Sequence, residues 1–155
     1  MIKALRIDHR MVHGQVAFTW THFLGATRII VIDDKAAADD FQKMTMNMAK
    51  PAGVKLNVFS VEKALERIQK IESLSDTIFI IFGNVHDASR FICAHPVFKE
   101  LNLGGIAKKE NSKLYTDVVY LTKDEEEDLK KVQATGCDVF MQQLPTTKRE
   151  ELKIS

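Results

Sequence analysis

The sequence predicts one α/β domain, built on an open, mostly parallel β-sheet of about seven strands with helices on both faces. Short β-branched runs alternate along the chain with segments whose apolar residues recur at helix spacing. Residues 29–32 and 77–82 form largely apolar runs, which are typical of parallel strands covered on both sides. The strand–helix units repeat every ~20–25 residues, without a linker or an internal repeat, so a single domain is expected over residues 1–155.

Each unit can be located from its pattern. In the first half, strands are expected at residues 2–7, 28–32, 54–59 and 77–82. The intervening helices are expected at residues 16–24 before Gly25, at residues 36–49 with Ala37, Phe41, Met44 and Met48 facing inward, and at residues 61–71 behind an N-cap at Ser60.

The second half continues the alternation. A helix is expected at about residues 87–94, a short strand at 100–103 before Gly104, a polar hairpin-like stretch at 108–113, and a strand at 115–121. Thr122 and Glu125 have the spacing of a capping box and open a helix that runs to Thr135. A last strand is expected at 138–141, followed by a frayed or shortly helical tail after Pro145.

Composition excludes several classes of function. The chain has 22 Lys and Arg against 21 Asp and Glu, a balance that predicts no nucleic-acid partner. Cys93 and Cys137 lie outside any metal-ligand spacing, so neither a metal site nor a disulfide is expected, in keeping with a reducing cytoplasm. The N-terminus does not have the pattern of a signal peptide, and the apolar runs are far shorter than the ~20 residues that span a bilayer. We therefore expect a soluble cytoplasmic protein without a cofactor.

The turn after the first strand carries the densest group of chemically active side chains. His13 precedes Gly14 and the start of a helix, where free backbone N–H groups attract anions. Arg10 supplies planar donors to the same anion, and Asp8 is expected to hydrogen-bond one ring nitrogen of His13. Gly14 would let the backbone approach a phosphate closely, and Gln15 is expected to bind the phosphate beside it. The pattern predicts a nucleophilic imidazole beside a phosphate cradle, which can transfer a phosphoryl group without a metal.

Two other functions are consistent with the same loop. A non-catalytic phosphate- or nucleotide-binding module would use the anion site alone, although no glycine-rich nucleotide motif is present. A hydrolase would use His13 as a general base, although no serine or cysteine nucleophile stands at a recognisable elbow. Acid-labile phosphate on His13 would favour the carrier. Nucleotide affinity without covalent labelling would favour the binding module, and phosphoester turnover without a partner protein would favour the hydrolase.

Residues 6–16 resemble the signature R-I-D-x-R-x-x-H-G-Q-V of the IIB components of the mannose–fructose–sorbose family of the bacterial sugar phosphotransferase system (PTS). The similarity continues at Trp20, at residues 28–34 and 49–54, at Leu-Asn-Leu-Gly-Gly (101–105), and at residues 143–146.

The resemblance implies a specific activity. His13 would accept a phosphoryl group, on Nδ1, from a phosphorylated IIA component, and would donate it to a sugar held by the membrane components IIC and IID. Such a protein would associate peripherally with the inner face of the cell membrane. His9 stands where relatives often have an acidic residue and is interpreted as a phosphate neighbour or a surface residue, while Asp33 and Asp34 would cap the next helix or orient the loop.

Overall fold

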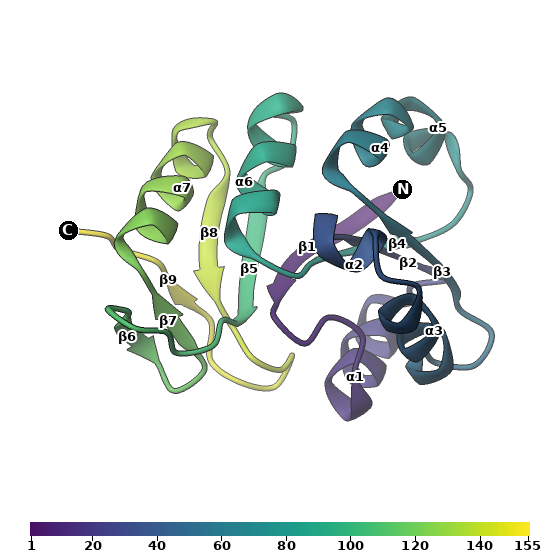
Figure 1. Cartoon of the computed structure of the whole chain (residues 1–155), viewed down its shortest axis with the longest axis horizontal. Helices are drawn as coiled ribbons and strands as arrows, with labels where there is room; N and C mark the ends of the chain where they lie inside the picture. Colours follow the sequence, from purple (N-terminus) through teal and green to yellow (C-terminus); the bar gives the residue numbers. More distant parts are fainter.

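The protein, described here from a computed structural model covering residues 1–155, is built on one seven-stranded sheet with the order β3-β2-β4-β1-β5-β8-β9 (Figure 1). All neighbouring strands run parallel except β8 and β9. The strands are β1 (Ile2–Asp8), β2 (Arg28–Ile32), β3 (Lys55–Phe59), β4 (Ile78–Phe82), β5 (Glu100–Gly105), β8 (Asp138–Met141) and β9 (Glu150–Glu151). The predicted fold class is confirmed.

Helices cover both faces of the sheet. One face carries α1 (Gly14–Leu24), α2 (Asp34–Ala37) and α3 (Asp40–Ala49), and the other carries α4 (Val61–Glu66), α5 (Ile68–Ser73), α6 (Val85–Ala94) and α7 (Lys123–Ala134). Successive side chains of β4 pack on opposite faces of the sheet, since Ile78 and Ile80 belong to the core on the α6 side while Phe79 and Ile81 belong to the core on the α1 side. Two apolar cores thus hold the sheet between them.

The helix expected at residues 36–49 is two helices. Asp39 starts a new one by accepting the N–H groups of Phe41 and Gln42, because its side chain competes with the continuing helix. The inward face assigned to this segment was wrong. Met46 is the buried residue of α3, whereas Phe41, Met44 and Met48 are 71%, 54% and 80% exposed. Because α3 begins anew at Asp40, the face that it turns to the core does not follow from the apolar periodicity of the residues before it.

Three further expectations are corrected. The helix after Ser60 is interrupted at Arg67, although Ser60 caps it as expected. The strand expected at 115–121 is an antiparallel hairpin, β6 (Lys113–Thr116) and β7 (Val119–Leu121), outside the main sheet. The tail after Pro145 was expected to be frayed or to form a short helix, but it contains no helix, and residues 150–151 pair with β8 as the sheet's edge strand, β9. The sheet has the expected number of strands but a different member.

The parallel strands place the loops after β1, β2, β4 and β5 at one edge of the sheet, where ligands of such folds bind. The candidate loop at residues 9–13 leaves β1 at this edge and enters α1 (Figure 1). No helix is long and apolar enough to cross a membrane.

Candidate functional site

The loop between β1 and α1 has a tightly fixed backbone. His9 N–H donates to Gly105 O at 2.9 Å, and Met11 N–H donates to Asp8 O at 2.9 Å. Met11 has φ +56°, a left-handed conformation that non-glycine residues rarely adopt, and Gly14 has φ +39°. These turns bring the chain round so that His13 stands at the start of α1.

α1 begins without the capping found at most other helices. His13 is its N-cap residue, in an extended conformation, but its side chain caps no N–H group, and no acidic residue lies in the first turn. By contrast, a carboxylate, amide or hydroxyl side chain caps α2, α3, α4, α6 and α7. A Cβ added at Gly14 would meet no atom within 4 Å, so the space beside these amides is open. Uncapped N–H groups with the positive end of the helix dipole form an anion site.

The His13 ring is half-buried, and its two nitrogens have different surroundings. Nδ1 lies 3.4 Å from the carbonyl oxygen of Met11. Nε2 is buried without a hydrogen-bond partner. The expected contact between Asp8 and the ring is absent, because the Asp8 carboxylate is already engaged within the loop and strand.

Asp8 instead holds the main chain of Arg10. Its Oδ1 accepts the Arg10 N–H at 3.0 Å, and its Oδ2 lies 3.4 Å from a guanidinium nitrogen of Arg6. Arg6 is buried and also donates to the carbonyls of Gln142 and Gln143, both at 3.0 Å. A Cβ at Gly104 would overlap the Arg6 guanidinium, so glycine is needed there.

Arg6 is a buried neighbour of the site that the sequence reasoning did not single out. Burial lowers the pKa of Arg6 to about 10, partly opposed by Asp8, and leaves it charged at neutral pH. Its guanidinium also lies 5.1 Å from the ring centre of Trp20, whose Nε1 donates to Gln143 O. The sequence did contain a signal for Arg6, because it is a charged residue inside an apolar strand. A charge in such a position is stable only when hydrogen-bonding or charged partners surround it.

Arg10 extends beside a cavity of about 300 Å³ that Asp8, His9, Gly104 and Gly105 also line. Its side chain forms no hydrogen bond or ion pair within the protein, and is available for a ligand. His13 does not line this cavity, and no hydrogen bond joins the Arg10 side chain to the ring. Gln15 is exposed on the first turn of α1.

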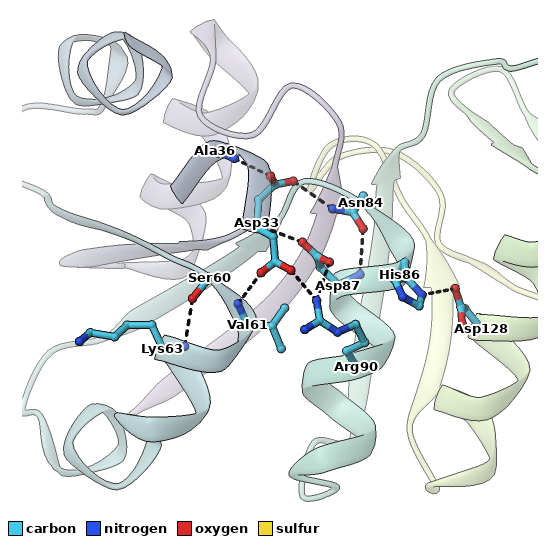
Figure 2. A network of polar contacts seen from close by, with 11 residues as sticks. Asp33, Ala36, Ser60, Val61, Lys63, Asn84, His86, Asp87, Arg90 and Asp128 are labelled. Carbon is cyan, nitrogen blue, oxygen red and sulfur yellow. Dashed lines mark hydrogen bonds and ion pairs between the residues drawn. The ribbon is translucent and has the colours of Figure 1, made fainter. Parts of the chain in front are cut away.

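The loop after β2 meets the start of α6 in a closed polar network (Figure 2). Asp33 caps α2 by accepting Ala36 N–H at 2.8 Å, as the capping interpretation expected, and also accepts Asn84 Nδ2 at 3.0 Å. Asp34 accepts Val61 N–H at 2.9 Å and pairs with Arg90 at 2.6 Å. These bonds lower the pKa of Asp34, with the Val61 bond as the largest cause.

No group of three or more His, Cys, Asp and Glu side chains is arranged to hold a metal ion. The available chemistry at this edge is therefore that of an imidazole, a free guanidinium and uncapped backbone amides. Together these suit a transferable anion more than a cation.

Comparison with known proteins gives a consistent result. Residues 2–154 match the family described as "PTS system sorbose subfamily IIB component". N-acetylgalactosamine-specific phosphotransferase enzyme IIB component 1 of Escherichia coli is 32% identical over 95% of this chain and 93% of its own length. The mannose-specific EIIAB component of the same species is 29% identical over 94% of this chain and 45% of its own length. The crystal structure of the E. coli N-acetylgalactosamine-specific IIB component 1 superposes with a TM-score of 0.92 at 31% identity, covering 99% of this chain and 100% of that one.

Proposed function

Because the chain belongs to the sorbose subfamily of the IIB components of the sugar phosphotransferase system, we propose that it is a phosphohistidine carrier and that His13 is the residue phosphorylated. The donor would be a phosphorylated IIA component. The acceptor would be a sugar held by the membrane components IIC and IID. Membership of the family assigns the chain to phosphoryl transfer in sugar uptake; the carrier residue and the partners are the proposal.

The observation that carries the proposal is the position of His13 at the uncapped start of α1. A phosphoryl group on this ring would lie near the amides of Gly14 and Gln15, whose N–H groups no side chain caps. Those amides and the helix dipole would stabilise the negative oxygens without a metal ion.

The chemistry is an in-line displacement by a neutral ring. A lone pair of His13 forms a new N–P bond as the N–P bond of the donor phosphohistidine breaks, and the donor nitrogen keeps the electron pair. In the second half, a sugar hydroxyl oxygen forms an O–P bond, the His13 N–P bond breaks, and the hydroxyl proton is released. Arg10, which has no partner within the protein, would neutralise the charge on the transferring group.

The surface beside His13 supports docking by other proteins. α1 and α3 lie on the same face of the sheet and expose large apolar side chains, which are common at protein interfaces. They are Phe18, Phe23, Phe41, Met44 and Met48. We infer that partners bind over these helices, and that docking on IIC and IID would bring the protein to the inner face of the membrane.

A second candidate is a non-catalytic phosphate-binding module. It is favoured by the cavity beside Arg10 and His9, which His13 does not line. Such a module would bind an anion reversibly and would never carry it covalently. Covalent labelling separates the two functions.

The test is phosphorylation of the protein by phosphoenolpyruvate, the general PTS carriers and a IIA component, followed by mass spectrometry under alkaline conditions. We expect one acid-labile phosphoryl group on His13. His13→Ala should abolish it while the circular dichroism spectrum stays unchanged. His86→Ala, which removes an exposed histidine of α6 on the opposite face of the sheet, is the control and should be labelled normally. Full labelling of His13→Ala would refute the assignment, and reversible anion binding alone would favour the module.

A further inference from the structure

The ring of His13 is held so that neither nitrogen presents a lone pair to solvent. The carbonyl oxygen of Met11, 3.4 Å from Nδ1, can only accept a hydrogen bond, so this contact favours the tautomer with the proton on Nδ1. The lone pair of the neutral ring is then on Nε2, which is buried and has no partner. A phosphoryl donor approaching from solvent cannot reach it in this conformation.

The residue that makes this contact is itself in an unusual conformation. Met11 is one of two non-glycine residues with positive φ, the other being Asn111 in the loop before β6. Such a conformation persists only where neighbouring structure holds it. Here the Met11 N–H donates to Asp8 O, and its thioether packs so closely on Gly83 that an added Cβ would lie 2.9 Å from Sδ.

We infer that Met11 is a positioning residue of the phosphoryl site, and that its carbonyl oxygen slows the reaction of His13 until the loop releases the ring. The inference rests on the proposed role of His13. At 3.4 Å the hydrogen bond is long, and the buried Nε2 gains nothing in exchange for its lost hydration, so release needs little work. On release the ring exchanges protons with water and presents a lone pair to the donor.

Two substitutions separate the backbone of Met11 from its side chain. Met11→Gly removes the thioether but favours positive φ, so the carbonyl should stay where it is. Met11→Val also removes the thioether, but a β-branched residue strongly disfavours positive φ, so the carbonyl should move. Asn111→Gly and Asn111→Val make the same changes at the other positive-φ residue, far from the loop in sequence, and are the matched controls.

The direct measurement is ¹⁵N NMR of the His13 ring in the free protein, which identifies the protonated nitrogen. We expect the Nδ1–H tautomer in the unsubstituted protein and in Met11→Gly, and a shift towards the Nε2–H tautomer in Met11→Val. The second measurement is the rate of His13 phosphorylation by phosphoramidate, a small donor that needs no partner protein. Met11→Val should react faster, by up to about five-fold, because five-fold is the factor for loss of one ordinary hydrogen bond and this one is long. The Asn111 variants should react at the unsubstituted rate.

A predominant Nε2–H tautomer in the unsubstituted protein would overturn the inference, as would equal rates for Met11→Val and the unsubstituted protein. If Met11→Val fails to fold, Met11→Ala, which disfavours positive φ less strongly, replaces it and should shift the tautomer in the same direction. Both measurements are made without PTS partners. Failure of IIA-dependent labelling would therefore count against the proposed function, whereas a wrong tautomer counts against Met11 alone.

Discussion

Two strand-to-helix junctions at the same edge of the sheet, β1–α1 and β4–α6, are built in opposite ways. At β4–α6, Asn84 caps the helix through Asp87 N–H, and Asp87 accepts Asp34 N–H at 2.8 Å (Figure 2). At β1–α1, no side chain caps the helix and the His13 Nε2 has no partner. We call β4–α6 the saturated junction, because its polar groups are hydrogen-bonded within the protein. We call β1–α1 the unsaturated junction, because it leaves helix N–H groups free for a ligand.

The contrast shows how one fold divides stability from function. β1 and β4 are paired neighbours in the sheet, so the two junctions start from the same platform. Met11 joins them, because its thioether packs on Gly83 at the end of β4. The saturated junction can then serve as a rigid support for the loop of the unsaturated junction.

Arg10→Ala, in the unsaturated junction, should have the largest effect of the substitutions considered, a loss of phosphoryl-transfer rate. Removing a donor that stabilises transferring charge costs about 10²-fold in rate, so the rate of phosphoryl transfer from IIA to this protein should fall by about that factor. Because the Arg10 side chain has no partner within the protein, the melting temperature should not change. Rapid-quench measurement of transfer gives the rate.

The matched control is Arg90→Ala in the other junction. Its guanidinium pairs with Asp34 and Asp87, so the substitution should lower the melting temperature and leave the transfer rate unchanged. An unchanged transfer rate in Arg10→Ala would remove Arg10 from the mechanism.

Asp87→Ala should destabilise the saturated junction. The carboxylate is buried, accepts Asp34 N–H and pairs with Arg90, so its loss leaves the Asp34 N–H without that acceptor and leaves Arg90 with Asp34 as its remaining partner. We expect the free energy of unfolding in urea to fall by about 2 kcal/mol. Asp124→Ala, at an exposed position of α7, should change it by less than about 0.5 kcal/mol. A loss of His13 labelling in folded Asp87→Ala would show that the two junctions are not separable.

Much of the fold could be predicted because strands and caps have local signals. The run at 77–82 and the capping box at Thr122 are recognisable from neighbouring residues alone, and both are confirmed. The motif at residues 6–16 was enough to identify the family, which the match over residues 2–154 confirms.

The failures share a different cause. Periodicity places Phe41, Met44 and Met48 on one face of a helix, but it cannot say whether that face meets the protein's own core or solvent. Likewise, the residue types of the loop gave no sign that Met11, and not Asp8, would face the His13 ring, because that depends on a single positive φ. Tertiary context decided both.

The smallest expected effect is the pH dependence contributed by Asp34. Its hydrogen bond from Val61 N–H, with Arg90 in support, holds the pKa of the folded state below that of the unfolded chain, near 3.9. A depressed carboxyl pKa stabilises the fold above the unfolded pKa, and this stabilisation is lost as the pH falls through the folded pKa. Asp34→Asn should therefore be less stable than the unsubstituted protein at pH 7 and should converge with it under acid. Because Asp34 is partly exposed, the difference should stay below about 1 kcal/mol. Urea unfolding of both proteins from pH 7 to pH 2.5 measures it, and a constant difference across that range would mean that the Asp34 charge contributes nothing to the saturated junction.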